Sequence, residues 1–532
     1  MNRYMLFIII FYLLLTSKAG GQSIFEKKYS ASTNDMVTRI ITTHEGGAIL
    51  SGKSNSFSLN DNHFLLKVDS MGMVKWAKWY GPGNAGINSI TAISSGKYVC
   101  AGYGPENNFT KAILFCVDTQ GSTLWSKAYN TLGSYWEATD IIMGLDNKLV
   151  MAGYAVESGD INPFICKLDT NGNVLAFRYD KSISSANNKI FAICQLPDSS
   201  YFGVGEIEGT QPNIYCIAPN KNLISVNPKI ISRGNLPGGR ARAIQLTNGG
   251  DVIIAGEVNV GGTNGIDILL MKINPLLQNS SHIKWVKTFG GTGTDLLVSL
   301  KRRSTGDYIA CGKSNSYGNS YQGILIEFDS LGNILLARQV GQGADEACQD
   351  ITEIPGGQTF ITGITSTTQD DIFLSRIHPH DTTCWMIPLT FSVTDRTSEY
   401  SFSSPGATSQ SFYLTTNIVL NDNLATISEN DLCPTTTLPI ISLTDKIMSI
   451  SPNPSFGNIQ LQIGRSFSKI TLRIGNVFGQ PILHWEIPVV EEGETISLQG
   501  KDLPTGIYFV HFLQHNQLIA TEKIMIIRDN DY

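Results

Sequence analysis

Residues 89–102, SITAISSGKYVCAG, carry the pattern that decides the fold, and it recurs as SLKRRSTGDYIACG at 299–312 and DITEIPGGQTFITG at 350–363. In each copy an aliphatic residue stands second, and a glycine follows twelve residues later. Two apolar runs flank a polar turn, which is the pattern of two antiparallel strands. The glycine recurs at spacings of 50 to 56 residues, at Gly52, Gly102, Gly153, Gly205, Gly256, Gly312 and Gly363.

Two further strands follow each of these glycines. A polar loop leads to a second apolar run and a tight turn, as in FLLKVDSMG (64–72), and then to a strand such as WAKWYG (76–81). The apolar residues of the second and third strands are consecutive, which is typical of strands buried on both faces. Four strands per repeat and a period near 50 predict an all-β fold, a seven-bladed β-propeller over residues 22–385.

The last repeat lacks a fourth strand, because its pattern ends near His378. Residues 24–29, IFEKKY, match the pattern of a fourth strand and precede the first repeat. We therefore expect the N-terminal segment to complete the last blade, so that the closed ring has no free strand edge.

The N-terminus predicts export. Met5 to Leu15 is an unbroken apolar run that follows Arg3 and precedes small residues. This is the pattern of a signal peptide over residues 1–21, with cleavage between Gly21 and Gln22. The run is too short to span a bilayer, and no other segment approaches transmembrane length. The net charge of -6 argues against a nucleic-acid partner.

Seven of the nine cysteines lie in strand-like apolar runs, where they are expected to be small buried hydrophobes. Cys384 and Cys433 instead flank the Ser/Thr-rich residues 386–445, predicted to be an exposed linker or a small strand pair. In an oxidising compartment these two cysteines could form a disulfide. No cysteines or histidines have the spacing of zinc ligands, so no metal site is predicted.

Residues 446–532 change pattern. Short strands such as NIQLQI (458–463) and GIYFVHFL (506–513) predict a small Ig-like β-sandwich. The segment resembles the type A C-terminal sorting domain of the Bacteroidetes type IX secretion system. The residues that carry the resemblance are Pro452, Asn453, Pro454, Gly475, Phe478, Gly479, Gln480, Gly506, Ile507, Tyr508 and Lys523.

The resemblance implies Sec export to the periplasm and then transport across the outer membrane by the type IX machinery. The product would be secreted or attached to the cell surface. The propeller repeat also resembles repeats of secreted Bacteroidetes propellers, which bears on the fold more than on the activity.

Binding residues are expected on one face of the propeller. The loops between second and third strands vary in length and contain polar residues such as Asn107, and variable loops on a rigid scaffold often form binding surfaces. Carboxylates gather near the starts of the first strands, where they could also hold Ca²⁺ through oxygen ligands. These carboxylates are Asp35, Glu137, Asp295, Asp345 and Glu346.

Three functions remain open from the sequence. The first is a non-enzymatic binding module for a glycan or a protein, and the second is a polysaccharide-acting hydrolase or lyase that uses the carboxylates. The third is a purely structural surface protein, in which the carboxylates only accept hydrogen bonds from strand-start amides. No catalytic set and no cofactor are predicted.

Overall fold

The computed structural model describes residues 24–433 and 448–527, apart from short gaps. The gaps are residues 82, 94–95, 131–134, 158, 182–186, 210, 225, 262–264, 319, 342, 382, 406–408, 411–412, 454, 457, 464–465, 477–479, 492, 500–502 and 515–516. The predicted signal peptide with its cleavage site at Gly21 and Gln22 lies outside the described residues, as do Pro454 and Gly479. The chain divides into two compact units, Met1–Cys433 and Pro434–Tyr532.

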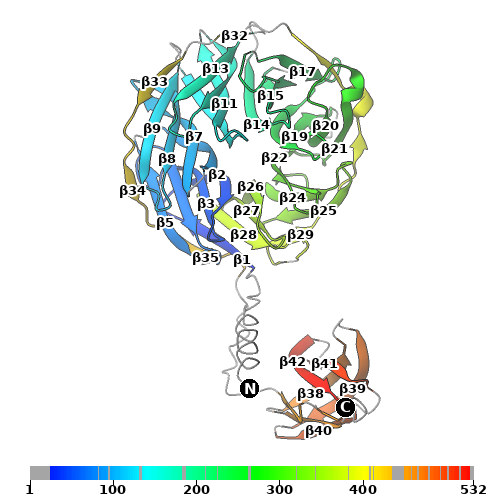
Figure 1. Cartoon of the computed structure of the whole chain (residues 1–532). Helices are drawn as coiled ribbons and strands as arrows, with labels where there is room; N and C mark the ends of the chain where they lie inside the picture. The colour runs from blue at the N-terminus through cyan, green and yellow to red at the C-terminus, as the bar shows by residue number, and fades with distance from the viewer. Residues whose placement is uncertain are drawn as a thin grey trace, which may run out of the picture. The chain divides into compact units, whose positions relative to one another are not determined.

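The first unit is an all-β, propeller-type ring in which sets of four antiparallel strands surround a common centre (Figure 1). The first sets are β2 (Asp35–Thr42), β3 (Ala48–Ser54), β4 (Asn62–Val68), β5 (Val74–Tyr80); β6 (Gly86–Ile93), β7 (Lys97–Glu106), β8 (Phe109–Val117), β9 (Thr123–Asn130); and β10 (Tyr135–Met143), β11 (Leu149–Glu157), β12 (Asp160–Leu168), β13 (Val174–Asp180). The β6–β9 and β10–β13 sets belong to one sheet, in which they are joined by the parallel pair Thr110 and Tyr135.

The remaining sets continue around the ring. They are β14 (Asn188–Gln195), β15 (Tyr201–Ile207), β16 (Asn213–Ile217), β17 (Pro228–Ser232); β18 (Arg240–Leu246), β19 (Val252–Asn259), β20 (Ile266–Ile273), β21 (Ile283–Phe289); β22 (Asp295–Arg302), β23 (Tyr308–Ser314), β24 (Gln322–Phe328), β25 (Ile334–Val340); and β26 (Asp345–Glu353), β27 (Thr359–Ser366), β28 (Asp370–Ile377), β1 (Phe25–Ser30). A short helix, η1 (Ser280–His282), precedes β21.

The N-terminal strand β1 is the fourth strand of the last set. It pairs antiparallel with β28, with Tyr29 opposite Ile372. The buried Tyr29 hydroxyl donates a 2.7 Å hydrogen bond to the Gly72 carbonyl of the neighbouring set. The segment that the sequence singled out for ring closure therefore lies between the last set and the first.

The repeated glycine is explained by a β-bulge in every inner strand, the first strand of each set. In β10, for example, the register shifts between Ala138 and Asp140, which leaves Thr139 as the extra residue. Gly153 lies opposite this shift, and a Cβ there would overlap the carbonyl oxygen of Glu137 and lie 2.9 Å from the Phe164 ring. The residues that occupy the bulge are Thr38, Asn88, Thr139, Phe191, Arg242, Val298 and Gln349.

Gly153→Ala is expected to destabilise the ring by about 2–3 kcal/mol, because the added methyl group meets backbone atoms that cannot move without breaking the β10–β11 pairing. Gly249→Ala is the matched control, since the nearest heavy atom to a Cβ there is 4.0 Å away. Denaturant unfolding of both variants measures the difference. Equal stabilities would mean that the glycine is not required by the bulge.

Residues 386–431, expected as a linker, instead form a belt of short strands around the outside of the ring (Figure 1). Each belt strand adds a fifth strand to one set, in the reverse of chain order. The partners are β29 (Met386–Pro388) on β25, β30 (Thr394–Asp395) on β21, β31 (Ser401–Ser403) on β17, β32 (Ser409–Gln410) on β13, β33 (Leu414–Asn417) on β9, β34 (Asp422–Leu424) on β5 and β35 (Ser428–Asp431) on β1. A second short helix, η2 (Thr397–Glu399), lies within the belt.

The linker interpretation is thus wrong for this part of residues 386–445. A Ser/Thr-rich composition suits an exposed outermost strand, because the backbone pairs with the ring while the side chains meet water. A disulfide between Cys384 and Cys433 joins the two ends of the belt. The belt and its disulfide therefore form a covalently closed hoop around the sets.

Apolar side chains fill the seams between neighbouring sets. One seam packs Leu50 and Leu66 of the first set against Phe360 and Leu374 of the last. Of the free cysteines among the described residues, all are buried except Cys194, which is partly exposed. No described helix has the length and apolar character needed to cross a membrane.

The second unit has two small sheets around one apolar core. The strands are β36 (Met448–Ser451), β37 (Asn458–Ile463) and β40 (Thr495–Gln499) in one sheet, and β39 (Pro481–Val490), β38 (Phe467–Gly475), β41 (Gly506–Gln514) and β42 (Gln517–Ile526) in the other. Ile459 and Leu461 of the first sheet share a core with Leu472, Val510 and Ile524 of the second.

Candidate functional site

The inner strands enclose two adjoining cavities on the axis of the ring. One has a volume of about 220 Å³, and every bulge residue lines it, together with Arg39, Glu137 and Tyr154. A bulge re-aims a side chain, so the glycine that imposes the bulge also brings one side chain per repeat to the axis. We call the bulge residues the bulge ring; they are Thr38, Asn88, Thr139, Phe191, Arg242, Val298 and Gln349.

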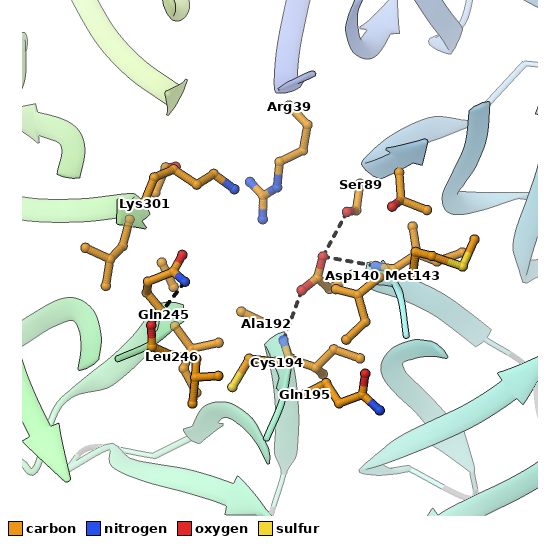
Figure 2. A pocket seen from close by; sticks show the side chains of 18 of the residues that line it. Arg39, Ser89, Asp140, Met143, Ala192, Cys194, Gln195, Gln245, Leu246 and Lys301 are labelled. Carbon is orange, nitrogen blue, oxygen red and sulfur yellow. Dashed lines mark hydrogen bonds between the residues drawn. The ribbon is translucent and has the colours of Figure 1, made fainter. Parts of the chain in front are cut away.

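The second cavity, of about 500 Å³, lies farther along the inner strands toward the turns that connect first and second strands. Its lining includes Arg39, Asp140, Cys194, Gln245 and Lys301, and Figure 2 shows these side chains around the open centre. Its volume falls in the range of small-molecule sites.

Glu137 is the carboxylate at the centre of the bulge-ring cavity. It accepts hydrogen bonds from Asn88 Nδ2 at 2.8 Å, from the Tyr135 hydroxyl at 2.6 Å and from the Tyr154 hydroxyl at 2.7 Å. Burial and the Glu137 charge raise the pKa of both tyrosines, so both hydroxyls stay protonated and donate at neutral pH. The carboxylate is therefore held in place.

Arg242 brings a cation to the same cavity. Its guanidinium binds the buried Glu257 carboxylate through two hydrogen bonds, of 2.9 and 2.7 Å, and lies 5.5 Å from the centre of the Phe191 ring. A bidentate pair of this kind fixes the plane of the guanidinium. The cavity thus combines amide, hydroxyl, aromatic and charged groups on a rigid frame.

Asp35 and Asp295, expected to face a ligand, are fully buried. Asp35 accepts hydrogen bonds from Ser54 Oγ at 2.6 Å, Ser56 Oγ at 3.0 Å and the Ala31 N–H at 2.8 Å. The donors to Asp35 thus come from the segment before β2, from the end of β3 and from the loop that follows β3, and Asp35 lines neither axial cavity.

Asp295 repeats the same arrangement. It accepts hydrogen bonds from Ser314 Oγ, from Ser316 Oγ at 2.6 Å and from the Gly291 N–H at 2.8 Å. Both carboxylates thus fix the starts of inner strands, and Asp295 also lines neither axial cavity.

The other expected residues also lie away from the two axial cavities. Asp345 is exposed and accepts a 2.9 Å hydrogen bond from the Tyr321 N–H. Asn107 is exposed at a loop tip with φ 51° and donates to Glu106 Oε1. Glu346 is buried and accepts a 3.4 Å hydrogen bond from Thr365 Oγ1. Of the six expected binding residues, Glu137 is the one that lines an axial cavity.

Sequence reasoning missed Arg39, Asn88, Tyr154, Arg242 and Gln349. The bulge residues among them could have been found, because each stands fourteen positions before a repeated glycine. In that column the repeats read Thr, Asn, Thr, Phe, Arg, Val and Gln. Such varied side chains at one fixed backbone position are typical of a surface adapted to a ligand.

The stability of the ring is expected to depend on the pH through Glu346. Burial raises the pKa of its carboxyl from 4.5 to about 7. The folded pKa lies above the unfolded one, so the contribution of this group to stability is fully present below pH 4.5 and is lost as the pH rises through 7. Glu346→Gln is expected to remove that loss, and to be more stable than the parent at pH 8 by about 2 kcal/mol.

Denaturant unfolding at pH 4.5 and pH 8 checks this expectation, with Asp160→Asn, at an exposed carboxylate on β12, as the control. Parallel pH profiles for the parent and Glu346→Gln would contradict the assignment.

The motif residues of the second unit hold its chain ends together. Asn453 donates a 2.7 Å hydrogen bond to the Lys523 carbonyl and accepts one of 3.0 Å from the Met525 N–H. The Tyr508 hydroxyl donates to the Pro504 carbonyl at 2.9 Å, just before β41 begins at Gly506. The Asn453 contacts tie the segment that follows β36 to the last strand, β42, whereas the Tyr508 contact is local to the start of β41.

Solved structures that are similar to this chain include three of the protein Sqt1. The Chaetomium thermophilum protein Sqt1 is 11% identical over 69% of this chain and 90% of its own, with a TM-score of 0.38. A second structure of Sqt1 is 9% identical over 66% and 97%, also with a TM-score of 0.38. Sqt1 bound to the N-terminus of the ribosomal protein L10 is 8% identical over 66% and 98%, with a TM-score of 0.39. Similarity at this level carries no information about ligands.

No curated protein has a sequence that matches this chain. A family model does match its C-terminal part: residues 449–527 match the secretion system C-terminal sorting domain. This range covers the two sheets of the second unit and the Asn453, Tyr508 and Lys523 contacts. The chain is therefore a propeller-type protein that carries the C-terminal sorting domain of the type IX secretion system and is exported by that system.

Proposed function

We propose that this protein is a secreted or surface-attached binding module whose ligand, a glycan or a protein segment, is held at the bulge ring. The observation that carries the proposal is the composition of the bulge-ring cavity. Two amide side chains, Asn88 and Gln349, line it together with the aromatic rings of Phe191 and Tyr154. Amide and aromatic groups on a rigid scaffold suit the hydroxyls and the C–H faces of sugars.

The proposal includes a finer architecture. The ring is a seven-bladed β-propeller, with one blade for each repeated glycine, and the second unit is an Ig-like sandwich. A Bacteroidetes signal peptide over residues 1–21 directs Sec export to the periplasm, and the sorting domain then directs transport across the outer membrane.

A binding role is favoured over a polysaccharide hydrolase by the carboxylates of the site. Glycoside hydrolysis in most families needs two carboxyl groups on either side of the scissile bond. Among the described residues that line the bulge-ring cavity, Glu137 is the one carboxylate, and three donors already engage it. A purely structural role would account for Thr38, Asn88 and Thr139, which donate hydrogen bonds to backbone carbonyls of the next set. It would not account for Phe191, Val298 and Gln349.

A glycan array with the purified protein tests the proposal, followed by titration of the best ligand against variants. Gln349→Ala and Tyr154→Phe are expected to weaken binding at least about tenfold, since each removes a hydrogen-bonding group from the cavity. Asn107→Ala, on an exposed loop, is the control and is expected to leave the affinity unchanged.

Binding that is lost in Asn107→Ala but kept in Gln349→Ala would place the site on the loops and overturn the proposal. Release of a shortened glycan during the titration would overturn the non-enzymatic reading.

A further inference from the structure

The larger axial cavity presents two cations to its open space. Arg39 is on β2 and Lys301 is on β22, and Figure 2 shows both side chains reaching toward the centre. Arg39 donates one hydrogen bond, from Nη1 to its neighbour's Thr38 carbonyl at 3.2 Å. Within the described part of the chain, neither side chain forms an ion pair.

The two carboxylates of the same cavity are already occupied. Asp140 accepts hydrogen bonds from Ser89 Oγ at 2.8 Å, its own neighbour Ile141 N–H at 3.0 Å and the Ile193 N–H of the next set at 2.9 Å. These donors fix the Asp140 carboxylate between neighbouring sets.

Asp350 has the same place on the other side of the ring. It accepts hydrogen bonds from the Ile40 N–H at 2.9 Å and from Ser299 Oγ at 2.5 Å. Both carboxylates therefore act as joints between sets and have their oxygens engaged by these donors, whereas Arg39 and Lys301 have no carboxylate partner among the described residues.

The lining of the cavity is partly apolar and partly polar. Apolar side chains such as Ile142 and Met143 lower the dielectric constant of the cavity, which strengthens the interactions of the charges that line it. Thr91 and Gln245 add a hydroxyl and an amide to the same lining. A guanidinium fork fits a carboxylate through two parallel hydrogen bonds, while an ammonium acts as a point charge beside it.

We propose that this cavity binds a sugar acid, with the carboxylate held by Arg39 and Lys301 and the sugar hydroxyls by the surrounding amide and hydroxyl groups. The site lies on the axis next to the bulge ring, so the acidic residue of a longer glycan would enter it through the bulge ring. This inference rests on the proposed binding function and names its ligand class.

Calorimetric titration of the purified protein with D-glucuronate and D-galacturonate tests the site. At least one uronate is expected to bind, and to bind at least about tenfold more tightly than glucose or galactose. Arg39→Gln and Lys301→Gln are each expected to weaken that binding at least about fivefold, and added salt is expected to weaken it further. Lys97→Gln, at an exposed lysine outside the cavity, is the control.

Cys194 provides a second readout, because it lines the cavity and is the partly exposed free cysteine. Its alkylation by a small thiol reagent is expected to slow when the uronate is bound.

Three results would each overturn the sugar-acid site. They are equal affinity for neutral and acidic sugars, binding of inorganic phosphate without binding of a uronate, and unchanged uronate affinity in the Arg39→Gln and Lys301→Gln variants. If the sugar-acid site fails these tests, loss of neutral-glycan binding in Gln349→Ala would still support the bulge-ring proposal. Failure of the sugar-acid site is therefore distinguishable from failure of the bulge-ring site.

Discussion

Cys384→Ser/Cys433→Ser is expected to destabilise the ring by about 4 kcal/mol, the loop-entropy value for a cross-link that closes roughly fifty residues. The disulfide spans a sequence separation of 49 and closes the belt around every set. Each belt strand contributes at most four residues of pairing, so the belt ends should fray once the cross-link is gone. Frayed ends expose the outer strands β25 and β1, where the belt begins and finishes.

Calorimetric melting and limited proteolysis measure this effect. The parent protein in reductant should match the double variant in both its melting temperature and its cleavage within the belt, and the variant should not respond to reductant. Cys194→Ser is the control, since Cys194 is a free cysteine. If the double variant has the same melting temperature and the same resistance to protease as the oxidised parent, the hoop adds no stability.

Deletion of residues 23–30 is expected to open the ring and to abolish its cooperative unfolding transition. The deletion removes β1, which pairs on one side with β28 and on the other with β35. It also removes Tyr29, whose side chain is 1% exposed and fills the seam between the last and the first set. The loss combines a strand, a large buried aromatic and two unpaired edges, and exceeds the about 3–5 kcal/mol typical of a buried aromatic alone.

The control for this deletion keeps the strand and changes only its surface. Ser30→Ala changes a partly exposed side chain at the end of β1, and is expected to cost at most about 0.5 kcal/mol. Calorimetry compares the three proteins. A truncated protein that melts like its parent would contradict closure by β1.

The repeat pattern predicted the ring because each repeat meets the same backbone requirement, a glycine opposite a β-bulge. The glycine of each repeat faces a bulge, so it recurs at a fixed distance from the first strand in every set. The closing strand was predictable for a related reason, since the last repeat lacks a strand that residues 24–29 can supply.

The belt could not be predicted in this way. Its strands are two to four residues long, with no alternation of apolar and polar positions, and their order depends on partners already arranged in the ring. A Ser/Thr-rich segment therefore looks the same whether it is a linker or an outermost strand.

The candidate site was predicted only in part. Asp35 and Glu137 both belong to inner strands, but Asp35 is covered by two serines from the sequence KSNS at 53–56. The same KSNS recurs at 313–316 and covers Asp295. The repeated KSNS was visible in the sequence. It distinguishes Asp35 and Asp295, whose carboxylates are buried at strand ends, from Glu137, which has no such serines.

The central claim is that the ligand binds at the bulge ring. Covalent blocking of the bulge-ring cavity tests this claim most directly. In a Cys194→Ser background, Gln349→Cys is alkylated with a bulky maleimide, and binding of the best array ligand is measured. If the ligand binds at the bulge ring, the adduct abolishes binding, whereas the same adduct on Asn107→Cys leaves it intact. Unchanged binding with the axis blocked, and loss with the loop blocked, would contradict this claim.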